Sequence, residues 1–390
     1  MNKKILFAAT SEGIQAGASR CYLNIVKEFV KRNIDFVCLL PKEGLMSEEL
    51  KKLGVRYYTV YDFNGVWQVE NDYRMNFVNY LKYVVKSFYN FFAVSRVKRI
   101  IRKEKIDIVH INSISRNVAA LAALKAKVPY VWHIRELLEE QMDSKFVNYK
   151  YAYELMNSAD NLICISKTVE DYYLKRFPFK NTCVIYDGID VKSFYKEREI
   201  FVDNEIKIGI IGRVDFQKRQ NIFLEACGLL KKDYPNIKCY VVGGYFEDEY
   251  YKQLKSVVEE YDIDGNVVFT GFVEDSSVYT KQCDIICACS HAEAFGLITV
   301  EALLSGALVI ASDSGCNLEL IKDNETGYLF RCDDIKDLYL KMKYAIENKN
   351  KSVVIAKDAQ KYSLSYSLDN NINNILKCYD EVLDRRKNGI

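Results

Sequence analysis

The stretch that decides the fold is Ser290-His-Ala-Glu-Ala-Phe-Gly-Leu-Ile-Thr-Val-Glu301. It follows a run of apolar and small residues, Asp284-Ile-Ile-Cys-Ala-Cys289, which is typical of a buried strand. After it, apolar residues recur at helical spacing until a glycine that would end a helix. The stretch therefore predicts a strand, a loop that carries His291 and Glu293, and a helix that begins next to Gly296.

The start of the predicted helix is suited to bind a phosphate. The first amides of a helix have no acceptor within it and lie at the positive end of its dipole. We therefore expect amides near Phe295, Gly296 and Leu297 to bind an anion. Glu301 follows in the same helix, and its carboxylate can accept hydrogen bonds from two hydroxyl groups. A phosphate site next to a diol acceptor indicates a nucleotide.

These residues resemble the signature of the retaining family 4 glycosyltransferases, which have the GT-B fold. The match consists of Glu293 and Glu301 with the intervening Ala-Phe-Gly-Leu. Two glutamates alone would also fit the surface of an ordinary crossover helix. The resemblance implies that Glu301 binds the ribose hydroxyls of a nucleotide sugar and that Glu293 contacts the transferred sugar. It places His291 and the amides after Glu293 at the donor, the amides on its distal phosphate.

The composition is that of a globular α/β protein with two domains. The chain has 390 residues, of which 49% are apolar and 28% are charged, and its net charge is +2. This balance favours no nucleic-acid partner. The twelve cysteines are scattered, several of them in apolar runs, and Met1 leads almost directly into a strand. We therefore expect reduced thiols, no signal peptide and a cytoplasmic location.

Two groups of residues could suggest a metal ion. Cys283, Cys287, Cys289 and His291 lie close in sequence, but no C-x-x-C pair is present and the run is typical of a core strand. The D-x-D at 262–264 precedes a predicted strand, so we interpret it as a turn. The sequence therefore predicts no metal site.

The first half of the chain alternates strands and helices, as in a doubly wound domain with a parallel sheet. Strands are predicted near residues 4–9, 35–40, 55–60, 107–111, 129–133, 161–165 and 183–186. A loop at 11–17 precedes the first helix, and the resemblance places Gly17 near the donor or acceptor. The spacing of its glycines does not fit the dinucleotide fingerprint. We assign residues 1–195 to an acceptor-binding Rossmann-like domain.

The same pattern begins again after a charged stretch. Strands are predicted near residues 207–212, 237–242, 267–270, 284–289 and 308–312. The resemblance implies that residues 205–365 bind the nucleotide sugar. It also implies that a C-terminal helix at 368–390 packs back on the first domain, and that the two Rossmann-like domains face each other across a cleft.

Two cations follow the first strand of the second domain. Arg213 comes directly after Gly212, and Lys218 lies five residues further on. An arginine and a lysine at the end of a strand can neutralise a diphosphate, and the resemblance assigns them that role. The family has glycine where this chain has Arg219. Further along, the resemblance places Gly271 and Phe272 at the base, and Gly315 in a loop near the phosphates.

His133 comes at the end of a predicted strand, where doubly wound domains place ligand-binding residues. A lone histidine is usually structural. The resemblance implies instead that this histidine reaches the donor sugar near the reacting carbon.

The segment 77–105 combines an apolar and aromatic helical face with a basic end. Lys82 and Lys86 interrupt the apolar run, so it cannot span a bilayer. It could lie on an anionic membrane surface, at the inner face of the cell membrane. A core-packed crossover helix with a solvated basic end is the alternative.

The resemblance implies transfer of a sugar from a nucleotide diphosphate sugar, UDP- or GDP-linked, to a hydroxyl of a glycan or lipid-linked acceptor, in polysaccharide biosynthesis. His133, Glu293, Arg213 and Lys218 are the catalytic candidates, and no cofactor or metal is expected. A nucleotide-sugar epimerase, a glycan phosphorylase and a non-catalytic subunit of a glycan-assembly complex are the alternatives. Glu301 and the two cations favour a nucleotide donor, and their joint presence disfavours a degenerate subunit.

Overall fold

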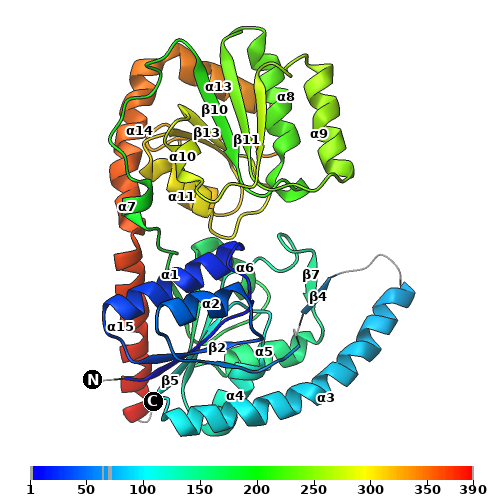
Figure 1. The fold of residues 1–390 in the computed structure, drawn as a ribbon, viewed down its shortest axis with the longest axis vertical. Coiled ribbons are helices and arrows are strands. Elements are labelled where there is room, and N and C mark those ends of the chain that lie inside the picture. Colours follow the sequence, from blue (N-terminus) through cyan, green and yellow to red (C-terminus); the bar gives the residue numbers. More distant parts are fainter. Residues whose placement is uncertain (1–2, 64–65, 69–72, 389–390) are drawn as a thin grey trace. The chain divides into compact units, whose positions relative to one another are not determined.

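The computed structural model describes the backbone of residues 3–63, 66–68 and 73–388, and within these ranges all side chains except those of 66–68, 73–80, 83 and 87. Its contacts divide the chain into two compact units (Figure 1). Unit 1 comprises Met1–Gly188 and Leu368–Ile390, and unit 2 comprises Ile189–Ser367. The boundary between the units lies between Gly188 and Ile189, whereas the predicted domain limits are residues 195 and 205. The acceptor and donor roles of the two domains remain predictions.

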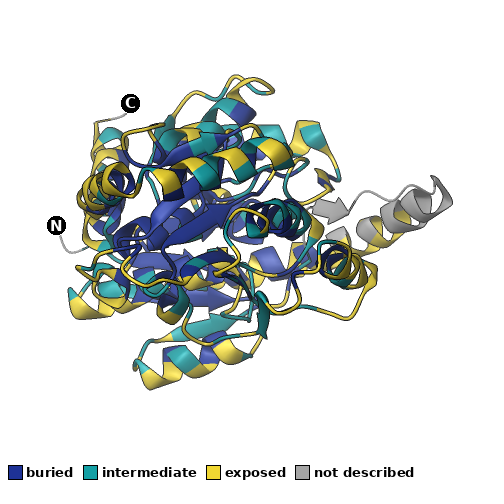
Figure 2. Ribbon diagram, turned by 90° about the horizontal axis from the view of Figure 1, so that it is seen from above, coloured by how far each residue is buried: buried dark blue, intermediate teal, exposed yellow. Residues whose placement is uncertain are grey.

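Unit 1 contains a seven-stranded sheet in the order β3-β2-β1-β5-β6-β8-β9, with every neighbouring pair parallel. Its strands are β1 (Ile5–Ala8), β2 (Phe36–Leu40), β3 (Tyr57–Thr59), β5 (Ile108–Asn112), β6 (Tyr130–Ile134), β8 (Asn161–Cys164) and β9 (Thr182–Val184). The central strands are buried along their whole length, as expected for a parallel sheet covered on both faces (Figure 2).

Helices connect these strands and cover the sheet. They are α1 (Gly17–Lys31), α2 (Leu45–Lys52), α3 (Tyr73–Glu104), α4 (Val118–Ala126), α5 (Tyr149–Asn157), α6 (Lys167–Leu174) and α15 (Leu368–Lys387). The C-terminal helix α15 joins the core of unit 1 through Ile372, Ile375, Tyr379 and Val382, which recur at helical spacing and are fully buried. A small antiparallel pair of β4 (Val66–Gln68) and β7 (Ser144–Phe146) was not predicted.

Unit 2 contains a six-stranded parallel sheet in the order β12-β11-β10-β13-β14-β15. Its strands are β10 (Ile206–Ile211), β11 (Ile237–Val242), β12 (Val267–Gly271), β13 (Ile285–Ala288), β14 (Leu308–Ser312) and β15 (Tyr328–Phe330), the last of which was not predicted. Its helical segments are α7 (Val191–Phe194), η1 (Phe216–Lys218), α8 (Gln220–Lys231), α9 (Glu249–Glu260), α10 (Ser277–Thr280), α11 (Leu297–Leu304), α12 (Asn317–Leu320), α13 (Ile335–Glu347), α14 (Lys349–Ser363) and η2 (Leu364–Tyr366). The doubly wound α/β architecture predicted for both halves is confirmed.

The strand order positions the candidate site. In unit 2 the chain builds outward from β10 through β11 to β12, and then returns to place β13 on the other side of β10. Such a reversal separates the loops that follow the two central strands, and ligands of doubly wound sheets bind between them. The loops after β10 and β13 carry most of the predicted donor residues. In unit 1 the equivalent reversal lies between β1 and β5.

Helix α3 differs from a core-packed crossover helix in its N-terminal half. Leu81, Val84, Val85, Phe88, Phe91 and Phe92 are all exposed. The alternative that this apolar face packs in the core is therefore wrong for these six residues. Phe77 and Val78, also part of the predicted apolar face, have side chains outside the described set, as do Tyr80 and Tyr83, which were predicted at the membrane interface. Among the described residues, no helix is both long and apolar enough to cross a membrane.

All twelve cysteines are free, and ten of them are buried. Cys283, Cys287 and Cys289 lie in the core around β13, where burial raises the pKa of each thiol. Their thiols therefore behave as small apolar groups, as predicted.

Candidate active site

The loops after β10 and β13 bring Lys218 and Glu293 together. Nζ of Lys218 lies 2.6 Å from Oε2 of Glu293, and the two side chains are 27% and 13% exposed. The residues are 75 positions apart in the sequence, so the strand reversal creates the contact. The lysine ammonium has three N–H donors and Glu293 accepts from one, which leaves capacity for a further anion.

Asp215 positions both cations of the first loop. Its Oδ1 accepts hydrogen bonds from the backbone amides of Gln217 and Lys218, at 3.1 and 3.2 Å, and so caps the short helix η1. Its Oδ2 accepts from Nε of Arg213 at 2.7 Å. The guanidinium of Arg213 is otherwise open to solvent, since its side chain is 72% exposed. Lys218 is the last residue of η1 and precedes α8, which begins at Gln220.

Two glycines allow the backbone segments after β10 and β11 to approach each other closely at this point. Gly212 and Gly243 follow the adjacent strands β10 and β11, and a Cβ at Gly243 would lie 1.9 Å from the carbonyl oxygen of Gly212. The aliphatic part of the Lys218 side chain covers Gly212. A Cβ built on Gly212 would lie 3.7 Å from Cδ of Lys218. The predicted glycine at 212 therefore lies directly under the candidate phosphate-binding lysine.

Arg219 takes the position of the family's glycine and keeps the backbone conformation that glycine favours. Its φ and ψ are 56° and 41°, in the left-handed region. A non-glycine residue pays about 1–2 kcal/mol for this conformation. The guanidinium stacks on Phe216, 4.1 Å from the ring centroid, and pairs with Asp333 at 2.8 Å. These contacts offset the strain, and the backbone after Lys218 keeps the turn.

The loop that carries His291 and Glu293 is held by the loop after β14. The hydroxyls of Ser312 and Ser314 both donate to the carbonyl oxygen of Ser290, at 2.7 and 2.9 Å. The amide of Cys316 donates to the carbonyl oxygen of Glu293 at 2.9 Å. Gly315 has φ +54°, and a Cβ there would lie 2.6 Å from the backbone nitrogen of Glu293. Gly315 thus supports Glu293 by close backbone packing.

Helix α11 begins at Leu297, immediately after Gly296, which has φ 87°. By helix geometry its first amides point out of the N-terminus toward the loop that carries Glu293. Phe295 is buried against Tyr366, with 6.1 Å between the ring centroids. Glu301, in the second turn, is only 2% exposed.

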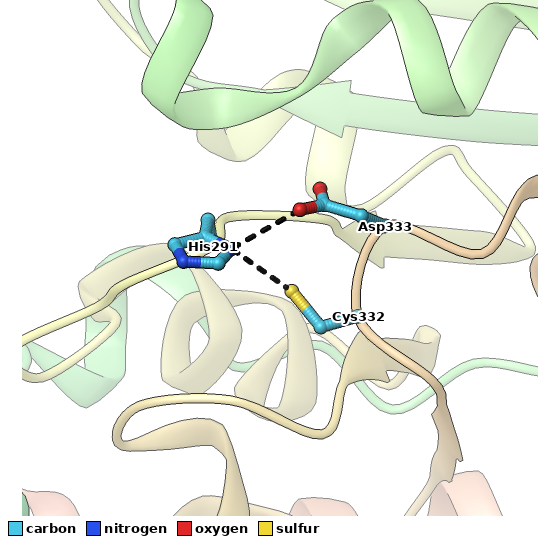
Figure 3. Close-up of side chains that lie close together, drawn as sticks. All are labelled: His291, Cys332 and Asp333. Carbon is cyan, nitrogen blue, oxygen red and sulfur yellow. Dashed lines mark hydrogen bonds and ion pairs between the residues drawn. The ribbon is translucent and has the colours of Figure 1, made fainter.

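His291, Cys332 and Asp333 form a small cluster beside the site (Figure 3). Nδ1 of His291 lies 3.1 Å from a carboxylate oxygen of Asp333 and 3.5 Å from Sγ of Cys332. These are potential metal ligands, within 4.8 Å of one another. Arg219, however, already neutralises Asp333. The cluster therefore fits a hydrogen-bonded anchor for the His291 side chain better than a cation site.

Gly271 and Phe272 lie at the end of β12, at the same edge of the sheet. Gly271 ends the strand with φ +68°, and the Phe272 side chain is 62% exposed. An exposed aromatic ring at this edge can stack on a planar group. The other predicted residues, Gly17 and His133, belong to unit 1, where Gly17 is the exposed first residue of α1.

His133 is fully buried near the end of β6 and belongs to a hydrogen-bonded chain. Its Nδ1 lies 3.2 Å from Nε2 of His110 and 3.3 Å from Nη2 of Arg135. On the far side of His110, Nδ1 contacts the hydroxyl of Tyr379 on α15. Arg135 is held by an ion pair with Asp187. Burial, and then the charge of Arg135, lower the pKa of both histidines well below the usual value.

These contacts fix the proton positions on both rings. The guanidinium of Arg135 can only donate, so Nδ1 of His133 accepts, and the neutral ring carries its proton on Nε2. His110 then donates from Nε2 and accepts the Tyr379 hydroxyl at Nδ1. Within the described residues Nε2 of His133 has no hydrogen-bond partner, although it is buried. This hydrogen-bonded network therefore ends in one unsatisfied N–H donor, Nε2 of His133, and a bound hydroxyl could accept its hydrogen bond.

Three supporting residues were not predicted. Asp215 could have been found, because an aspartate three residues before Lys218 is a typical helix N-cap. The roles of His110 and Tyr379 arise from contacts between residues 269 positions apart, and no local signal reports them.

Two family profiles match the chain, and together they cover most of it. The profile described as glycosyl transferases group 1 matches residues 191–362, and that described as glycosyltransferase family 4 matches residues 16–193.

Relatives of known activity match over most of their length. An N,N'-diacetylbacillosaminyl-diphospho-undecaprenol alpha-1,3-N-acetylgalactosaminyltransferase of Campylobacter jejuni is 25% identical, over 94% of this chain and 97% of its own. A second Campylobacter jejuni enzyme, which adds alpha-1,4-linked N-acetylgalactosamine to a diphospho-undecaprenol glycan, is 23% identical over 81% of this chain and 87% of its own. The Anabaena protein Alr3699/HepE, crystallised with UDP, has the same fold, with a TM-score of 0.80 and 21% identity over 97% of this chain and 100% of its own.

Proposed function

This chain belongs to the group 1, family 4 glycosyltransferases, and from that premise we propose that it moves a hexose-type sugar from a UDP- or GDP-linked donor to a hydroxyl of a glycan or lipid-linked acceptor, with retained anomeric configuration. The observation that carries the proposal is the Lys218–Glu293 pair, placed with Arg213 where the strand order of unit 2 reverses. A pair of cations at this point is suited to a diphosphate.

The barrier to transfer is departure of the nucleoside diphosphate, which leaves oxocarbenium character on the sugar. Negative charge then develops on the distal phosphate. Lys218, Arg213 and the first amides of α11 would stabilise that charge, because preorganised donors aimed at developing charge lower the barrier. Glu293, held beside Lys218, would contact the transferred sugar. No covalent nucleophile is required if the departing diphosphate accepts the proton of the acceptor hydroxyl.

The remaining donor contacts follow from the ends of the strands. Glu301 would accept hydrogen bonds from the ribose hydroxyls, and Gly271 and Phe272 would meet the base. His291 would contact the phosphates, oriented by Asp333. Gly17, at the N-terminus of α1, would contribute a backbone amide.

His133 would donate a hydrogen bond to the sugar. Two observations support this role: its Nε2 is buried without a partner in the described structure, and the contacts at Nδ1 place the proton on Nε2. An unsatisfied buried donor costs about 1–3 kcal/mol, which a sugar hydroxyl would recover on binding.

We propose that the transfer needs neither a metal ion nor a cofactor, since two cations and a helix N-terminus are available for the leaving group. Transfer should then survive excess chelator, and loss of turnover in chelator that Mg²⁺ restores would overturn this part. We further place the enzyme in the cytoplasm, at the inner face of the cell membrane. There it would meet a lipid-linked acceptor of the kind named for the two Campylobacter relatives.

A thermal-shift screen with UDP, GDP and their sugar conjugates tests the proposal directly. A ligand at 100 times its Kd stabilises the folded state by about 2.7 kcal/mol. We expect one base to raise the Tm and its sugar conjugate to be turned over with release of the nucleoside diphosphate. No shift with any nucleotide would refute the donor assignment.

A further inference from the structure

The outward face of α3 changes from apolar to basic along the helix. In its N-terminal half, Val85 and Phe88 are 73% and 72% exposed, and the neighbours on the same face are also exposed. These apolar residues are Leu81, Val84, Val85, Phe88, Phe91 and Phe92. At a helical repeat of about 3.6 residues they form a stripe roughly a third of the circumference wide.

The same face continues with cations toward the C-terminus of the helix. Arg96, Arg99, Arg102 and Lys103 are exposed and follow the stripe at spacings of three or four residues. Within the described part of the chain, Arg96, Arg99 and Arg102 have no ion pair. The face therefore ends in several uncompensated positive charges.

Contacts on the opposite side fix the direction in which the stripe points. Ala93, Val94, Val97 and Ile101 are buried. Asn90 is buried as well, and it exchanges two hydrogen bonds with the backbone of Phe63, at 2.9 and 3.1 Å. The helix cannot rotate its apolar stripe inward without breaking these contacts. In Figure 1 the N-terminal part of α3 extends beyond the sheet of unit 1.

We propose that this face binds the surface of an anionic phospholipid bilayer, with α3 lying along the membrane. The apolar stripe enters the boundary between headgroups and acyl chains, and the basic end contacts headgroup phosphates. This inference deepens the membrane contact proposed above by naming the residues that make it. It stands on the exposure and charge of α3 alone, and its test needs no turnover.

The net positive charge of α3 indicates which kind of partner its exposed face binds. Residues 73–104 contain eight lysines and arginines and one acidic residue, Glu104. Glu104 is buried and already paired with Lys4 and Arg56. Two copies of this helix would bring like charges together, whereas an anionic lipid surface attracts each cation by about 1 kcal/mol. Charge complementarity thus favours a membrane over a second copy of the chain.

Vesicle co-sedimentation of the full chain tests the proposal. We compare vesicles of phosphatidylcholine alone with vesicles that also contain phosphatidylglycerol. The wild type should bind the anionic vesicles and release them at high salt. The double variant Val85→Ser/Phe88→Ser should bind roughly 30-fold more weakly, because it loses two apolar side chains from the stripe. Arg96→Gln/Arg99→Gln/Arg102→Gln should lose the preference for anionic lipid.

A matched control removes exposed apolar side chains elsewhere. Val202 and Val354 are 70% and 58% exposed in unit 2, and Val202→Ser/Val354→Ser should bind vesicles like the wild type. Equal binding by the Val85/Phe88 variant and the wild type would overturn the proposal. A second result would also overturn it: the wild type does not bind vesicles but forms a dimer in analytical ultracentrifugation, and the Val85/Phe88 variant does not form this dimer. Nucleotide binding, measured in the same preparations, reports separately on the donor site.

Discussion

Replacing Lys218 with methionine removes the cation at the centre of the candidate site while keeping the length of the side chain. In the proposed reaction Lys218 stabilises the departing diphosphate. Loss of one preorganised donor of this kind lowers kcat by about 10²–10³, or about 2.7–4 kcal/mol. We therefore expect turnover of Lys218→Met to fall by at least about 100-fold.

The same substitution also breaks the ion pair with Glu293, so its effect on stability must be separated. Exposed pairs contribute about 0–1 kcal/mol and breaking a buried pair costs about 3–5 kcal/mol. With side chains 27% and 13% exposed, the Lys218–Glu293 pair falls between these limits. Lys207 offers a matched control, because it is 25% exposed and pairs with Asp203 at 2.7 Å in the same unit.

The assay measures release of the nucleoside diphosphate from the donor selected by the thermal-shift screen, together with urea unfolding of each variant. Lys207→Met should keep wild-type turnover, whereas Lys218→Met should lose it while remaining folded. Near wild-type turnover by a folded Lys218→Met would refute the role of the lysine. An equal loss in both variants would show that the effect comes from unit 2 stability and not from the site.

Three further predictions concern single residues and pH. Glu301→Ala should abolish detectable transfer and weaken binding of the donor nucleotide, measured by calorimetry; unchanged affinity would exclude a ribose contact. His133→Ala should lower kcat strongly with nucleotide binding retained, and unchanged turnover would make His133 structural. Because the pKa values of His110 and His133 are lowered in the folded protein, the unfolded chain binds more protons than the folded chain below about pH 6.5. The free energy of unfolding should therefore keep its highest value above that pH and decrease as the pH falls below it. Urea unfolding of His133→Gln should show a shallower acid loss than the wild type, and identical slopes would contradict the assignment.

The sequence predicted the elements of both sheets well because parallel strands buried on two faces are continuous apolar runs. The strands at 237–242 and 308–312 have the predicted bounds. The strands β4, β7 and β15, of three residues each, were missed, whereas β3 and β9, which are equally short, were predicted within the alternation of strands and helices. For α3 the pattern identified an apolar face but could not say what covers it, because helical periodicity is the same for a core and for an exposed stripe.

For the candidate site, the sequence identified Lys218 and Glu293 separately, and the resemblance supplied their roles. Their 2.6 Å contact depends on the order of strands in the sheet, which no local pattern contains. Arg219 shows the opposite case. The family has glycine at this position, yet the turn persists in this chain, because stacking and ion pairing hold the arginine in a left-handed conformation.

The return of α15 to unit 1 has a consequence for biosynthesis. A ribosome makes the chain from the N-terminus, and residues 1–188 emerge long before Ile372, Ile375 and Tyr379, which complete their core. Unit 2 is continuous in sequence and can fold as it emerges, whereas unit 1 must wait with an open apolar surface until α15 has been made. A stop codon before residue 368 would therefore leave the first-made half of the enzyme unfinished and in need of a chaperone.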